Sequence, residues 1–130
     1  MLNGCRVLVV EDEDLVVELL KDVLLEADAL IVGPAANVSA ARQLIRDGVE
    51  IDVAVLDLNL SDGSVTPVLE ALAGRGIPMI VYTGGNLPDA LRHRHPNLRV
   101  LTKPVSPARL LGELRSVLRG SSLQKPVVAP

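Results

Sequence analysis

The chain has 130 residues, of which 48% are hydrophobic, and its formal net charge is −3 at pH 7. A chain of this size favours a single domain, and its apolar residues suffice for a core. A chain with this weak negative charge has no overall positive surface potential, so we expect it not to bind nucleic acids or acidic membrane surfaces directly.

Short apolar runs alternate with amphipathic stretches from one end of the chain to the other. This alternation is typical of repeated strand–helix units, so it predicts an α/β fold with a doubly wound parallel sheet covered by helices on both faces. The predicted strands are residues 5–10, 29–33, 52–57, 78–83 and 98–102. The predicted helices are residues 14–27, 37–48, 65–73, 86–96 and 106–120.

Local signals mark most of these helices. Asn37 is the expected N-cap of the second helix, and Gly48 suits the left-handed position after it. Ser106 is the expected cap of the last helix, which we expect to stop at Gly120. The first helix carries an apolar stripe at helical spacing, which we expect to be buried: Val16, Leu19, Leu20, Val23, Leu24 and Ala27.

Two segments lack a clear pattern. Prolines bracket residues 86–96, so we expect a short or mobile element there. Residues 121–130 contain two prolines and show no periodicity. We therefore expect one folded domain over residues 1–120 and a disordered tail over the last ten residues.

The compartment is also predicted from the sequence. No apolar run approaches the length of a membrane span, and the first residues, MLNGCR, lack a signal-peptide pattern. The single cysteine, Cys5, lies in an apolar run and is expected to serve in packing. We therefore expect a cytoplasmic protein with no membrane partner.

Polar residues follow the predicted strands at the point where each strand ends. They are Glu11 and Asp12 after the first strand, Asp57 and Asn59 at the third, Thr83 at the fourth, and Lys103 at the fifth. In a doubly wound sheet the carboxyl ends of the strands line one edge, where ligands bind. Carboxylates that share a small space there repel one another, and a hard divalent ion such as Mg2+ suits an all-oxygen cluster.

Each of these residues also has a purely structural explanation. The acidic run 11–14 could simply favour the start of a helix, and Asp57 could form a turn. Thr83 could be an ordinary β-branched strand residue, and Lys103 a solvated charge. Their joint occurrence at the ends of different strands favours a common site.

Four segments carry a resemblance to a known family. VVEDE (9–13), VLDLNLSDG (55–63), VYTGG (81–85) and LTKPV (101–105) resemble the receiver domains of two-component response regulators, over residues 5–119. The resemblance implies a (βα)5, flavodoxin-like fold of strand order 2-1-3-4-5. It also implies a phosphorylatable aspartate, bound Mg2+, and a signalling role rather than that of a true enzyme.

The resemblance assigns roles to the polar residues. Asp57 would accept the phosphoryl group, with Lys103 supplying charge and Thr83 a hydroxyl that donates to the phosphoryl oxygens. The carboxylates of Asp12 and Asp57 and the backbone carbonyl of Asn59 would hold Mg2+, with Glu11 reaching it through water. The implied partners are a sensor histidine kinase or histidine phosphotransferase and a downstream protein target. The chain would be a free-standing receiver, favoured by the start at Met1, or a domain excised from a hybrid kinase.

Position 100 departs from the family pattern. Val100 stands three residues before the lysine, where receivers often carry an aromatic side chain that moves with the hydroxyl residue. Tyr82 precedes Thr83, so we expect it to point to the opposite side of its strand and do not assume that it replaces the missing aromatic.

Two other functions conflict with particular residues of the chain. A phosphatase or dehalogenase-type hydrolase would need a second aspartate two residues after its nucleophile, where this chain has Asn59, which cannot deliver a proton. A nucleotide-binding protein would want a glycine-rich loop where the acidic run 11–14 stands. The alternative that stays open is a receiver-like interaction module that is never phosphorylated.

Overall fold

The computed structural model describes residues 2–96 and 98–124. Its main sheet has five parallel strands in the order β2-β1-β3-β6-β7. These strands are β1 (Arg6–Val10), β2 (Leu30–Ala35), β3 (Val53–Asp57), β6 (Met79–Thr83) and β7 (Arg99–Thr102). Counted along the main sheet alone, this is the expected order 2-1-3-4-5, so the predicted α/β fold is confirmed.

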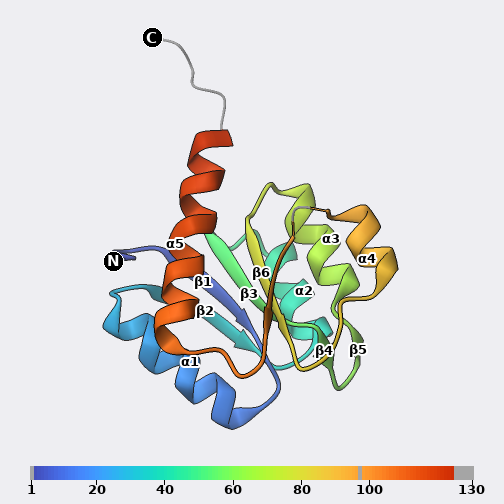
Figure 1. Cartoon of the computed structure of the whole chain (residues 1–130), viewed down its shortest axis with the longest axis horizontal. Helices are drawn as coiled ribbons and strands as arrows, with labels where there is room; N and C mark the ends of the chain where they lie inside the picture. Colours follow the sequence, from blue (N-terminus) through green and yellow to red (C-terminus); the bar gives the residue numbers. More distant parts are fainter. Residues whose placement is uncertain (1, 97, 125–130) are drawn as a thin grey trace.

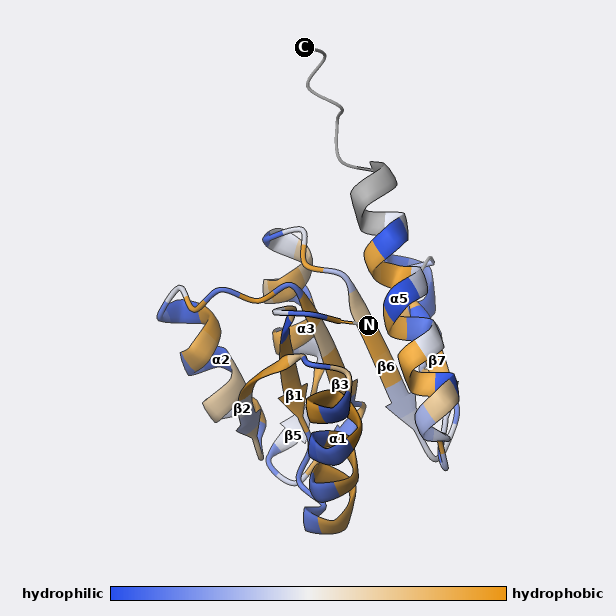
Figure 2. Ribbon diagram, turned by 90° about the vertical axis from the view of Figure 1, so that its left-hand side faces the viewer, coloured by the Kyte–Doolittle hydropathy of each residue, from blue (hydrophilic) through white to orange (hydrophobic). Residues whose placement is uncertain are grey.

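Helices cover both faces of the sheet (Figure 1). They are α1 (Asp14–Glu26), α2 (Val38–Arg46), α3 (Thr66–Gly74), α4 (Asp89–Arg94) and α5 (Pro107–Gln124). One core lies between the sheet and α2, α3 and α4, and the other lies between the sheet and α1 and α5. Figure 2 shows hydrophobic strands in the interior, while the helices carry both hydrophobic and hydrophilic residues.

Strand β3 shows why this sheet must be covered on both sides. All five of its residues are buried. Val53 and Val55 pack in the core beneath α1 and α5, whereas Ala54 and Leu56 pack in the opposite core. Successive side chains of a strand point to opposite faces, so a strand that is apolar at every position requires apolar partners on each face. Asp57 is therefore carried to the edge by a strand with no solvent-facing side.

The predicted helix starts are confirmed where side chains cap them. Asn37 Oδ1 accepts a hydrogen bond from the Ala40 amide at 2.7 Å, and Ser106 Oγ accepts one from the Arg109 amide at 3.1 Å. Gly48 follows α2 with a φ of +74°, which is the left-handed conformation expected there. These caps satisfy amide groups that have no partner inside the helix.

Other local predictions were wrong. Helix α5 does not stop at Gly120 but continues to Gln124, because this glycine keeps a helical backbone instead of turning left-handed. Residues 125–130 of the predicted tail lie outside the described residues. Leu19 is 46% exposed, although its spacing predicts that it is buried with the apolar stripe of α1. The helix presents a narrower buried face, formed by Leu20, Val23 and Leu24.

A small hairpin follows β3. Strands β4 (Asn59–Leu60) and β5 (Gly63–Ser64) pair antiparallel, and the turn-forming residues after Asp57 lie at their junction. In that turn, the Asp62 carboxylate accepts hydrogen bonds from the amides of Val38 at 2.9 Å and Ser39 at 3.3 Å. The first of these bonds is the main reason that the pKa of Asp62 is lowered. The hairpin thereby ties the loop after Asp57 to the start of α2.

The described part of the chain includes no helix with the length and apolar character needed to cross a membrane.

Candidate functional site

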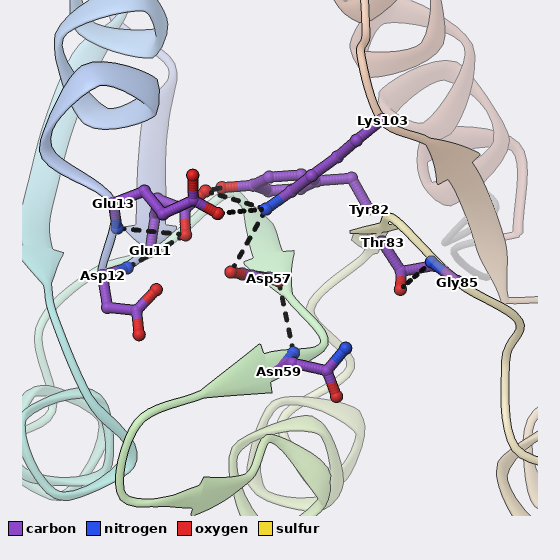
Figure 3. Close-up of polar contacts among 9 residues, drawn as sticks. All are labelled: Glu11, Asp12, Glu13, Asp57, Asn59, Tyr82, Thr83, Gly85 and Lys103. Carbon is purple, nitrogen blue, oxygen red and sulfur yellow. Dashed lines mark hydrogen bonds and ion pairs between the residues drawn. The ribbon is translucent and has the colours of Figure 1, made fainter.

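The sheet brings together acidic residues that are far apart in the sequence. Strands β1 and β3 are neighbours, with Val10 beside Leu56, so Glu11 and Asp57 emerge at the same edge. Glu11, Asp12 and Asp57 each offer a carboxylate oxygen, and the three oxygens lie within 4.8 Å of one another. Figure 3 shows Glu11 and Asp12 leaving the segment before α1 and Asp57 leaving the end of β3. The predicted acidic cluster therefore exists in the fold.

Lys103, which follows β7, extends its ammonium group toward Glu11, Glu13 and Asp57 (Figure 3). Its Nζ is 3.4 Å from an oxygen of Glu11, 3.4 Å from Asp57 Oδ2 and 3.2 Å from Glu13 Oε1. Partial burial of the ammonium lowers its pKa, but the surrounding carboxylates outweigh this effect, and the net pKa of Lys103 is raised. The lysine is therefore charged and held against Asp57 by electrostatic attraction.

Glu11 is the most constrained carboxylate of the group, and it is only 1% exposed. Its Oε2 accepts hydrogen bonds from the amides of Asp12 at 3.0 Å and Glu13 at 3.4 Å. Its Oε1 accepts a hydrogen bond from the Tyr82 hydroxyl at 2.8 Å. Burial, together with the neighbouring Asp57, raises the pKa of Glu11 to about 7, although Tyr82 and Lys103 favour its charged form.

Asp57 itself is 3% exposed and contacts its own loop. The backbone amide of Asn59 donates to Asp57 Oδ1 at 3.2 Å, while Asp57 Oδ2 faces Lys103. The two oxygens of this carboxylate thus have different partners. One oxygen is held by the backbone amide, and the other lies beside the Lys103 ammonium group.

Thr83 lies at the same edge, at the end of β6, and is 1% exposed. Strand β6 pairs with β3, with Tyr82 beside Asp57 in the register. The Thr83 hydroxyl accepts a hydrogen bond from the Gly85 amide at 3.1 Å and, in Figure 3, lies on the side of Gly85 and away from Lys103. The fold therefore brings Thr83 to the site, with its hydroxyl engaged in its own loop.

Two residues of this site were not predicted. Glu13 was treated only as part of an acidic helix start, yet its carboxylate contacts Lys103. Tyr82 points to the face opposite Thr83, as expected, and on that face it reaches Glu11 and Lys103. The sequence offered one signal that could have found it, because Tyr82 is the only aromatic residue of the chain and precedes a polar strand end.

The donor set fits a hard divalent cation. Mg2+ prefers oxygen ligands and is commonly bound through one or two carboxylates, with water completing its coordination. The three clustered carboxylates carry more negative charge than one lysine neutralises, and two of them are buried. The acidic cluster is thus compatible with a metal site.

The family model of the response regulator receiver domain matches residues 7–115. The chain therefore belongs to the receiver domain family of two-component signalling. The search of curated proteins found no match.

Solved structures agree with this assignment. The solution structure of SdrG from Sphingomonas melonis Fr1 is 36% identical, with a TM-score of 0.74 over 88% of this chain and 97% of that chain. A CheY-like response regulator receiver domain protein from Methanospirillum hungatei JF-1 is 22% identical, with a TM-score of 0.83 over 94% of this chain and 99% of that chain. The signal receiver domain of a putative Luxo repressor protein from Vibrio parahaemolyticus is 24% identical, with a TM-score of 0.81 over 98% of this chain and 99% of that chain. The last two likenesses show the fold alone.

Proposed function

We propose that this chain accepts a phosphoryl group on Asp57 from a phosphohistidine of a sensor histidine kinase or a histidine phosphotransferase, and then changes its contacts with a downstream protein target. Receiver domains are signalling proteins and not classical enzymes, and they interact with histidine kinases and effectors. One observation carries the proposal: Asp57 Oδ2 lies 3.4 Å from the Lys103 ammonium, within a cluster of three carboxylates. A cytoplasmic location, where such donors act, is part of the same proposal.

The chemical step is a transfer of phosphorus from nitrogen to oxygen. A carboxylate oxygen of Asp57 attacks the phosphorus, the new O–P bond forms, and the P–N bond breaks. The electron pair of the broken bond stays with the imidazole nitrogen of the donor, which takes up a proton from water. The product is an acyl phosphate on Asp57 and a free histidine on the donor.

Charge stabilisation is the main task of the surrounding residues. The transferred group spreads negative charge over its oxygens in the transition state, and Lys103 is held where it can contact one of them. Asp12, Asp57, the Asn59 backbone carbonyl and, through water, Glu11 would hold Mg2+. When bound, the metal supplies positive charge beside the reacting oxygens. The contact between the Asn59 amide and Asp57 Oδ1 orients the carboxylate before the attack.

Thr83 would convert phosphorylation into a change of shape. Its hydroxyl is engaged with the Gly85 amide in the present arrangement. Phosphorylated Asp57 would offer a stronger, charged acceptor, and a hydrogen bond to it would draw Thr83 and its loop inward. Gly84 and Gly85, which follow Thr83, give that loop backbone freedom. The surface around the carboxyl end of β6 would then differ between the two states.

Mass spectrometry after exposure to acetyl phosphate and Mg2+ tests this proposal. We expect the mass of one phosphoryl group to be gained by the wild-type chain and not by Asp57→Asn. Asp62→Asn is the matched control, because Asp62 lies in the same loop but caps α2, and this variant should be modified like the wild type. If the wild type gains no phosphate, the chain is instead an interaction module that works without phosphorylation.

A further inference from the structure

Tyr82 contacts both the acidic cluster and the lysine. It is the single aromatic residue of the chain, and it is 4% exposed at the end of β6. Its hydroxyl donates to Glu11 Oε1 at 2.8 Å, and the Lys103 ammonium lies 5.0 Å from the centre of its ring (Figure 3). We propose that Tyr82 is a positioning residue of the phosphoacceptor site, which aligns Glu11 through its hydroxyl and Lys103 through its ring. This inference rests on the proposed function.

The hydroxyl completes the fixation of the Glu11 carboxylate. Backbone amides hold Oε2 of Glu11, and side chains supply the contacts to Oε1. Of these, Lys103 lies at 3.4 Å, whereas the Tyr82 hydroxyl makes a short bond of 2.8 Å to a buried acceptor. Partners outside the ligand shell commonly orient the ligands of a metal in this way. Without the hydroxyl, Oε1 would keep only the longer contact to Lys103, and Glu11 would be less ready to serve a cation.

The ring limits where the lysine can go. A cation within about 6 Å of an aromatic ring centre is attracted to its face, and the flexible four-carbon stem of lysine leaves the ammonium free to move otherwise. Tyr82 and Lys103 also line a cavity of about 370 Å3 between α1 and α5, together with apolar side chains that include Val55 and Leu110. A smaller side chain at position 82 would enlarge this cavity beside the lysine stem. The ring thus keeps the ammonium close to Asp57.

A simpler reading treats Tyr82 as a core residue. Tyr82 does pack with Ile80 and Leu101 in the core beneath α1 and α5. A residue that only fills space would be replaced by phenylalanine without effect on the site, because the two rings have nearly the same volume. The hydroxyl and the ring can therefore be tested separately, using Tyr82→Phe and Tyr82→Leu.

The experiment measures Mg2+ affinity by calorimetry and the rate of phosphoryl uptake from acetyl phosphate at saturating Mg2+. For Tyr82→Phe we expect Mg2+ affinity to fall about tenfold, with the rate within a few-fold of wild type because the ring remains. For Tyr82→Leu we expect the same loss of Mg2+ affinity. In addition, we expect phosphoryl uptake to be about tenfold slower, because the Lys103 ammonium loses its contact with the aromatic ring. Leu110→Ala is the matched control, since it should lower the melting temperature and leave Mg2+ affinity unchanged.

The outcomes separate this inference from the proposed function. If Tyr82→Phe has wild-type affinity, the hydroxyl does not align Glu11, and if Tyr82→Leu also keeps the wild-type rate, Tyr82 serves only in packing and the inference is overturned, even when the wild type is phosphorylated. If the wild type takes up no phosphate, the proposed function fails, while the affinities still decide the role of the hydroxyl. Tyrosine fluorescence gives a further check, because the signal comes from Tyr82 alone. We expect it to change when Mg2+ is added, and an unchanged signal would contradict coupling between Tyr82 and the metal site.

Discussion

The buried Glu11 carboxylate should make the stability of the metal-free protein fall as the pH rises from about 4.5 to about 7. Burial raises the pKa of Glu11 from an ordinary 4.5 to about 7 in the folded chain. Between these values the folded state holds a proton that the unfolded state has lost. Raising the pH therefore favours the unfolded state within this window, and the effect levels off above the folded pKa.

The size of this change in stability follows from the shift in the pKa of Glu11. A rise from 4.5 to about 7 corresponds to about 3 kcal/mol in the free energy of unfolding, since each pH unit is worth about 1.4 kcal/mol. For a chain of 130 residues, such a change moves the melting temperature by roughly 10 °C. Added Mg2+ should reduce the loss of stability near pH 7, because a bound cation favours the ionised form of the acidic cluster.

Thermal unfolding of the metal-free protein at a series of pH values measures the effect. Glu11→Gln keeps the size of the side chain and cannot titrate, so its melting temperature should depend much less on pH in this window. Comparison with wild type removes the contributions of other titrating groups. Glu26→Gln, at the exposed end of α1, is the control, and its melting temperature should depend on pH as in the wild type. If the melting temperature of Glu11→Gln depends on pH as strongly as that of the wild type, Glu11 is not the source of the pH dependence, and the reasoning fails.

Two further substitutions test other parts of the account. Lys103→Ala should keep Mg2+ affinity within a few-fold of wild type. Phosphoryl uptake from acetyl phosphate should slow roughly 100-fold, because the lysine acts on the transferred group. Equal losses of affinity and of uptake rate would contradict the role assigned to Lys103. Asn37→Ala should lower the free energy of unfolding in urea by about 1 kcal/mol, because the Ala40 amide loses its acceptor. Asn37→Asp keeps an acceptor and should recover most of that loss; if it does not, capping is not the cause.

The elements and the acidic edge could be predicted because they depend on local patterns. A strand such as β3, apolar at each position up to Asp57, has to be buried on both faces, so it belongs inside a parallel sheet. Helices were found from their apolar spacing and caps, and residues at strand ends were expected at one edge because parallel strands end together. The predictions were wrong where packing in the folded protein outweighed a local sequence pattern. Gly120 stayed helical, and Leu19 was left exposed on α1.

The fold class and the types of residue at the site follow from the sequence, because hydrophobic periodicity and the polar residues at strand ends are local features of the chain. Which of these residues contact one another depends on how the strands are arranged in the folded protein. Tyr82 and Glu13 joined the site because the neighbouring ends of β1, β3 and β6 and the segment after β7 direct their side chains into one small space. Glu11 acquired its raised pKa for the same reason, because burial and the approach of Asp57 come from segments that no local pattern relates.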